Sequence, residues 1–165
     1  MRAVVLVEGV TDRIALEAVA AKLGLDLAAG VVEIVPIGGA QAIRRAAAQY
    51  EGGDRVAGLC DAGEERWFRR VLADATHVCV KDLEDELIRA LGADRVQEVV
   101  AAQGELDTFR NFQNQLYWRG RPVESQLRRW LQNGGRRHRY PPHLVEAMEP
   151  AEIPRPLAGV LAAVA

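Results

Sequence analysis

The sequence predicts an α/β fold in which a mostly parallel four-stranded sheet is flanked by helices and followed by a helical C-terminal extension. Short apolar runs recur along the first half of the chain, and an amphipathic helical pattern follows each of them. After Gly92 the strand pattern stops while the helical pattern continues. Strands that alternate with helices indicate βαβ units, which form parallel sheets. We therefore expect residues 1–92 to form the α/β domain and residues 93–165 to form a helical extension packed on it.

Four short segments have the composition of buried strands, each a compact apolar run that contains β-branched residues. The expected strands are residues 3–8, 31–37, 55–61 and 76–80. The two cysteines, Cys60 and Cys79, fall inside the last two of these runs. Reduced thiols in the core are therefore favoured over a disulfide or a metal pair.

A helix is expected after each strand, and Thr11 suits the N-cap of the first one. The later helices are expected at residues 41–50, 64–73, 82–91, 94–103, 105–116, 123–132 and 142–148, before a last apolar stretch at 156–165. Within the extension, glycine and proline pairs should punctuate the chain at Gly134-Gly135 and Pro141-Pro142.

Several classes of protein are disfavoured by what the sequence lacks. No apolar stretch approaches the roughly 18 residues of a membrane span, and no signal peptide precedes the first strand, so a cytoplasmic location is expected by default. The three histidines are scattered, and no zinc-binding spacing occurs. Without a GxxxxGK[ST] motif, the chain is not expected to hydrolyse ATP through a P-loop. The sequence makes no prediction of oligomeric state.

Charge is distributed unevenly along the chain, although the net charge is only -2. Residues 1–107 carry a charge of -7, whereas residues 108–140 hold eight arginines against the single acid Glu124. An acidic part beside a basic part hints at a protein that handles polyanions.

The basic segment also holds six of the nine aromatic residues, and arginine interleaved with aromatic rings suits a surface that follows a nucleic-acid backbone. The alternative is that its apolar residues form the buried faces of helices, which we favour for Phe109, Phe112, Leu116, Leu127, Trp130 and Leu131. For the arginines we favour contact with nucleic acid. The residues expected to make such contacts are Arg128, Arg129, Arg136 and Arg137, together with Lys81 after the fourth strand.

Acidic residues close two of the expected strands, Glu8 the first and Asp61 the third. In an open parallel sheet, ligands gather at the carboxyl ends of the strands. If the two strands are neighbours, Glu8 and Asp61 face one crevice, where their charges repel unless a cation lies between them. Magnesium suits such oxygen ligands, so the sequence predicts a site for Mg²⁺ or Mn²⁺ at this edge.

Other acids near this edge have competing explanations. Asp12 lies in the first turn of the expected helix, where interaction with the helix dipole competes with a role in metal binding. Asp82 and Asp85 have the spacing of an N-cap and its partner, which favours a structural role. Glu84 lies between them, and its role as a cap or as a metal ligand stays open.

These residues carry a family resemblance. VLVEGVTD at 5–12, PIGGA at 36–40 and GLCDAGEE at 58–65 resemble the successive motifs of a TOPRIM domain, the catalytic module of topoisomerases, primases and several nucleases. The DLEDEL segment and the later GRRHRYPPHLVEAM are more similar to the nuclease part of the OLD (overcoming lysogenization defect) family. The resemblance covers about the first 90 residues well and the helical part loosely.

The resemblance implies specific roles for matching positions. Glu8 corresponds to the TOPRIM glutamate, a metal ligand or general acid/base, and Asp61 to the first aspartate of the DxD motif. Asp12 matches the second acid of the ExxxE/D pair in OLD-like nucleases, and Glu84 the acid of a second metal ion.

Two positions depart from the family pattern. The second DxD aspartate is Gly63 here, so the neighbouring Glu64 is expected to substitute for it, or one of the two metal ions is weakly held. The family's lysine, which precedes an aromatic residue, corresponds to Arg137 ahead of Tyr140. Arginine keeps the positive charge but differs in shape and stays protonated.

The function expected from the sequence is therefore metal-dependent hydrolysis of phosphodiester bonds in DNA, by an endonuclease or nickase of the TOPRIM/OLD type. One or two bound ions would activate water and stabilise the leaving oxygen. The alternatives are an RNA-processing TOPRIM nuclease and a catalytically weak module that binds nucleic acid or a separate ATPase subunit.

Overall fold

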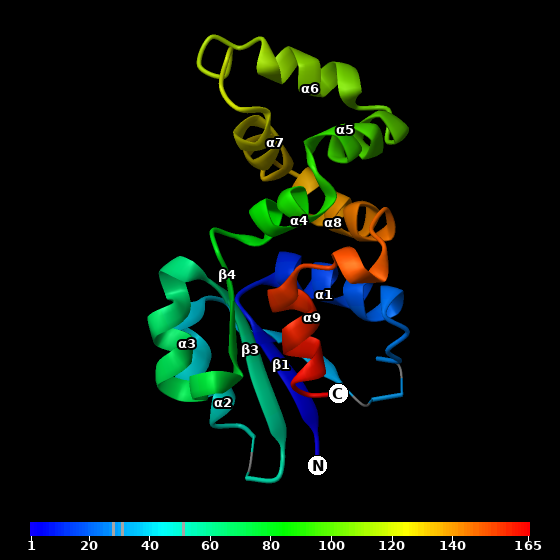
Figure 1. Ribbon diagram of the computed structural model, residues 1–165. Coiled ribbons are helices and arrows are strands. Elements are labelled where there is room, and N and C mark those ends of the chain that lie inside the picture. The colour runs from blue at the N-terminus through cyan, green and yellow to red at the C-terminus, as the bar shows by residue number, and fades with distance from the viewer. Residues whose placement is uncertain (28, 31, 51) are drawn as a thin grey trace.

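The computed structural model describes residues 1–27, 29–30, 32–50 and 52–165. Its strands form one parallel sheet in the order β2-β1-β3-β4 (Figure 1). The strands are β1 (Ala3–Val7), β2 (Glu33–Pro36), β3 (Arg55–Asp61) and β4 (Thr76–Cys79). The predicted parallel sheet is confirmed, whereas Val31, the predicted start of the second strand, lies outside the described residues.

Helices follow the strands and make up the second half of the chain in the described residues. The α-helices are α1 (Val10–Lys22), α2 (Ile43–Ala47), α3 (Glu65–Leu72), α4 (Leu83–Leu91), α5 (Ala93–Ala102), α6 (Leu106–Gln113), α7 (Val123–Leu131), α8 (Arg136–Glu146) and α9 (Arg155–Ala162). Short 3-10 turns are η1 (Ala40–Ala42), η2 (Ala62–Glu64), η3 (Ala73–Ala75) and η4 (Pro150–Glu152). None of the described helices is long and apolar enough to cross a membrane.

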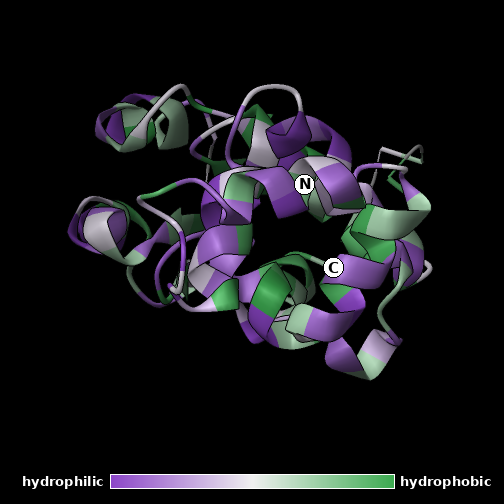
Figure 2. Ribbon diagram, turned by 90° about the horizontal axis from the view of Figure 1, so that it is seen from above, coloured by the Kyte–Doolittle hydropathy of each residue, from purple (hydrophilic) through white to green (hydrophobic). Residues whose placement is uncertain are grey.

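The sheet separates two apolar layers, and β1 shows how. Its alternate residues Val5 and Val7 join the cluster that includes α1, α8 and α9, whereas Val4 and Leu6 join the cluster with α2 and α3. Figure 1 shows α4 to α7 beyond the carboxyl end of the sheet. In Figure 2, hydrophobic and hydrophilic residues alternate along the helical ribbons, as expected for helices with one buried face.

Two predicted boundaries of helices are wrong. The N-cap of α1 is Gly9 rather than Thr11, because the extended backbone of Gly9 directs its N–H to the Asp12 carboxylate at 3.0 Å. Helix α8 begins at Arg136, whereas the sequence predicted a helix that begins at residue 142. It continues through Pro141 and Pro142, where an interruption was expected. Burial of Pro141 and its apolar neighbours in the core outweighs the loss of backbone donors, since tertiary packing overrides intrinsic propensity.

The basic and aromatic segment is mostly a set of packed helix faces. Phe109, Phe112 and Trp130 are buried, and the Trp130 ring lies edge-on to Phe109 with centroids 5.4 Å apart. The prediction fails for Leu116, which is 87% exposed. Helix α6 ends at Gln113, so Leu116 leaves the helical register that would have buried it. Cys60 and Cys79 are free and buried, as predicted.

Candidate active site

The carboxyl ends of β1 and β3 bring two acids together. Val7 pairs with Leu59, so Glu8 and Asp61 follow at adjacent strand ends. The backbone N–H of Asp61 donates to Oε1 of Glu8 at 3.0 Å. The side chain of Glu8 is thereby oriented across the gap between the two strands.

A loop of two glycines forms the next wall. Gly38 and Gly39 both donate their N–H to the backbone oxygen of Glu8 at 3.1 Å. Their φ angles of 80° and 121° lie in a region that favours glycine over residues with a side chain. The PIGGA segment is thus required to bring the backbone of β2 against the end of β1.

These segments line a polar pocket of about 370 Å³ at the carboxyl edge of the sheet. It is lined by Glu8, Gly9, Thr11, Asp12, Gly38, Gly39, Asp61, Asp82, Leu83, Glu84, Gln132 and Arg137. Residues from both the sheet and the helical extension therefore meet in one hollow. Four of the five predicted metal-binding acids lie in it, namely Glu8, Asp12, Asp61 and Glu84.

The fifth predicted metal ligand, Glu64, lies to one side. It lines a second hollow of about 450 Å³, which shares Glu8, Gly38 and Gly39 with the first. Glu64 also acts on Glu8 through charge, because its repulsion contributes to the raised pKa of Glu8. The structure thus places Glu64 next to the pocket and not in its wall.

Of the predicted basic residues, the structure brings Arg137 alone into the wall of the pocket. Arg128 forms an ion pair with Asp82, with 2.5 Å between nitrogen and oxygen. Arg136 stacks over the Trp130 ring and donates from Nε to the Trp130 carbonyl at 2.8 Å. Lys81 and Arg129 are exposed and lie outside the residues that line the pocket.

Sequence reasoning missed three polar residues of the pocket wall, namely Thr11, Asp82 and Gln132. Thr11 was expected only as an N-cap. Asp82 was assigned a capping role, which it has, because its carboxylate accepts the N–H of Asp85 at 2.9 Å. The same side chain also lines the pocket. Gln132 lies about 50 positions from Asp82 and Glu84, its two carboxylate partners, and no sequence motif marks it.

Burial and mutual repulsion favour the protonated forms of the acids in the pocket. Loss of solvent raises the pKa of Asp61 to about 7, with further increases from the charges of Glu8 and Asp12. Loss of solvent likewise raises the pKa of Asp12 to about 6, although the Gly9 N–H opposes the shift. Burial also raises the pKa of Glu8 and Glu84 above the ordinary value.

The donor chemistry of the pocket fits a divalent cation that prefers oxygen. Repelling carboxylates are stabilised by a cation placed between them. Among the described residues, no group of three or more His, Cys, Asp or Glu side chains forms a ready-made metal cage. Magnesium does not require one, because it is usually held by one or two carboxylates with retained waters and substrate phosphates. Glu8 and Asp61 supply that smaller set.

We expect the stability of the metal-free protein to fall as the pH rises from about 4 to about 7 because of Asp61. Its pKa is raised in the folded state, so the unfolded chain binds fewer protons in this range and gains relative stability as the pH rises. The Asp61→Asn variant lacks this titration. In urea unfolding with EDTA, the free energy of unfolding of the variant, relative to that of the wild type, should therefore increase as the pH rises. A difference between the two proteins that does not change with pH would contradict the assignment of this pKa to Asp61.

Residues 1–52 match the family described as the overcoming lysogenization defect protein-like TOPRIM domain. No curated protein matches the sequence significantly. Solved structures do resemble the whole chain.

The C-terminal region of the Xanthomonas campestris pv. campestris OLD protein is similar, with a TM-score of 0.73 at 18% identity, over 99% of this chain and 91% of that one. The C-terminal region of the Burkholderia pseudomallei OLD protein gives a TM-score of 0.70 at 13% identity, over 98% and 95% of the two chains. The resemblance to the OLD type is thereby confirmed for the fold. The chain thus matches an OLD-like TOPRIM domain family over residues 1–52 and has, over nearly its whole length, the fold of the C-terminal region of OLD proteins.

Proposed function

We propose that the protein is a metal-dependent endonuclease or nickase that hydrolyses phosphodiester bonds in DNA. The observation that supports this most is the pocket itself, whose wall, among the described residues, contains Glu8, Asp12, Asp61 and Glu84 and one cationic side chain, that of Arg137. Buried acids with raised pKa values are typical of sites that hold a divalent ion or move protons.

The acidic residues of the site have different proposed roles. Glu8 and Asp61 would hold the first Mg²⁺ or Mn²⁺ ion with Asp12 beside them, and Glu84 would serve a second ion, with Glu64 in support from the neighbouring hollow. A bound divalent ion supplies a Lewis acid for the phosphate and lowers the pKa of attached water. The raised pKa of Glu8 also favours a role as general acid or base, because burial makes its carboxylate a stronger proton acceptor.

Arg137 has a role that differs from that of the acids. It lines the pocket, and its charge opposes part of the rise that burial causes in the pKa values of Asp12 and Glu84. Negative charge accumulates on the phosphate as the nucleophile attacks, and a cation held in place stabilises that charge. Arg137 thus stands where the family resemblance puts a lysine.

Two alternative functions each have a specific argument in their favour. An RNA-processing nuclease would use the same pocket, because the acids would act on the phosphodiester through a bound ion and would not read the base. A catalytically weak module that binds nucleic acid or a separate ATPase subunit is favoured by Gly63 at the DxD position and by the lack of a ready-made metal cage among the described residues.

We expect the purified protein to convert supercoiled plasmid to nicked or linear DNA when Mg²⁺ or Mn²⁺ is added, without ATP. EDTA should abolish the reaction, and a structured RNA of similar length should be cut more slowly. Gel electrophoresis of both substrates measures the two rates. Faster cleavage of the RNA would favour the RNA-processing alternative, and binding without cleavage of either substrate would favour the weak module.

A further inference from the structure

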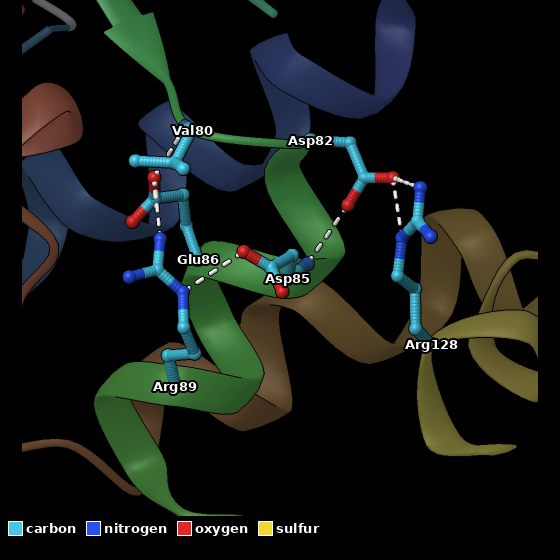
Figure 3. Close-up of polar contacts among 6 residues, drawn as sticks. All are labelled: Val80, Asp82, Asp85, Glu86, Arg89 and Arg128. Carbon is cyan, nitrogen blue, oxygen red and sulfur yellow. Dashed lines mark hydrogen bonds and ion pairs between the residues drawn. The ribbon is translucent and has the colours of Figure 1, made fainter. Parts of the chain in front are cut away.

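The junction between β4 and α4 is held by a network of polar contacts, drawn in Figure 3. At its centre is Asp82, which is 9% exposed. One carboxylate oxygen caps α4 by accepting the Asp85 N–H at 2.9 Å. The other accepts from Arg128 Nε at 2.7 Å and from Gln132 Nε2 at 3.0 Å. Both oxygens of Asp82 thus accept hydrogen bonds, one from α4 and the other from α7 and the turn that follows it.

The same Gln132 amide also reaches Glu84, whose Oε2 lies 3.4 Å from its nitrogen. Glutamine is a neutral donor, so it orients Glu84 without cancelling the negative charge of that side chain. Arg128, in contrast, forms a full ion pair with Asp82. The network therefore supplies a counter-charge to Asp82 and orients Glu84 without supplying one to it.

The other side of the junction is fixed from within α4. Glu86, which is 7% exposed, accepts the backbone N–H of Val80 at 2.8 Å. Arg89 pairs with both Asp85 and Glu86 (Figure 3). Helix α4 thus contacts the residue that follows β4 through its own Glu86, whereas α7 and the turn after it supply contacts next to Glu84.

We propose that Arg128 and Gln132 are positioning residues of the candidate active site, which through Asp82 fix the first turn of α4 and thereby the Glu84 carboxylate. The proposal rests on the function proposed above, in which Glu84 serves a metal ion. It assigns Arg128 to Asp82 in place of the nucleic-acid contact expected from the sequence. The helical extension then contributes to metal binding itself.

Removal of Arg128 leaves the buried carboxylate of Asp82 without its cation, next to Glu84 and Asp61. An unpaired buried charge forces neighbouring groups to move or to take up protons. Arg128→Lys restores the charge but not the two-nitrogen contact, so it should rescue in part. Gln132→Leu removes the amide alone and keeps the ion pair, which separates the two restraints.

The test measures Mn²⁺ affinity by electron paramagnetic resonance and DNA affinity across a salt series in Ca²⁺. Arg128→Ala should weaken Mn²⁺ binding by roughly tenfold, the lower range for partners that orient metal ligands. Gln132→Leu should weaken it in the same direction, and Arg128→Lys should lie between Arg128→Ala and the wild type. DNA affinity and its salt slope should stay at wild-type values. Arg155→Ala is the matched control, since Arg155 is exposed and makes no ion pair within the described part of the chain.

Other outcomes overturn the proposal in distinguishable ways. If Arg128→Ala binds Mn²⁺ normally while its salt slope flattens by about one unit, Arg128 contacts DNA phosphate instead. If neither Arg128→Ala nor Gln132→Leu changes Mn²⁺ affinity, the network is structural only. Should Arg128→Ala fail to fold, the Gln132→Leu result decides. A wild-type protein that neither binds Mn²⁺ nor cleaves overturns the proposed function, and the positioning roles fall with it.

Discussion

Glu8→Gln is expected to lower the rate of plasmid cleavage by about three orders of magnitude, within the range for loss of a general acid or base. The amide cannot carry the negative charge that holds a cation, and it cannot accept a proton. The fold should persist, because a glutamine oxygen still accepts the Asp61 N–H that Glu8 now accepts at 3.0 Å. Single-turnover cleavage rates and thermal unfolding curves measure the two effects.

Glu17→Gln is the matched control for this experiment. Glu17 lies on α1 and pairs with Arg13 on the surface, so it undergoes the same chemical change away from the pocket. Its cleavage rate should equal that of the wild type. A Glu8→Gln variant that cuts at the wild-type rate would show that the acids at the sheet edge do not carry the chemistry.

Arg137→Ala is expected to reduce the cleavage rate constant by roughly a hundredfold, with only a modest loss of DNA affinity. The loss falls on the rate because the charge of Arg137 is needed most when the phosphate gains negative charge in the transition state. Single-turnover rates at saturating DNA, together with DNA affinity measured in Ca²⁺, separate the two contributions.

Two comparisons make the Arg137 result specific. Arg137→Lys installs the residue that the family resemblance places there, so it should retain most of the activity. The Arg155→Ala variant should leave rate and affinity unchanged. If Arg137→Ala also leaves both quantities unchanged, Arg137 is an ordinary solvated arginine and has no part in the site.

The sheet and its acidic edge could be predicted because they depend on local patterns. Apolar runs mark the strands, and acids at the ends of parallel strands must meet at one edge once β1 and β3 are neighbours. That rule alone puts Glu8 beside Asp61. The two glycines of the PIGGA motif, Gly38 and Gly39, could also be recognised in the sequence. Their backbone angles in the structure are ones that favour glycine.

The features that the sequence did not predict depend on contacts between segments that are distant in sequence. Gln132 reaches Glu84 because α7 packs on α4, and neither helix pattern carries that information. Arg128 was expected to contact nucleic acid for the same reason, since its partner Asp82 is 46 residues away. The continuity of α8 through Pro141 likewise follows from packing against α1, which outweighs a local signal for a break.

The central claim is that Glu8 and Asp61 together hold a divalent ion. Anomalous diffraction from crystals soaked in Mn²⁺ tests it most directly, because manganese is located independently of any assay of activity. We predict a manganese peak within about 2–2.5 Å of carboxylate oxygens of both residues, the range of hard cations bound by oxygen. Crystals that show manganese elsewhere, or none in the pocket at millimolar Mn²⁺, would contradict the account.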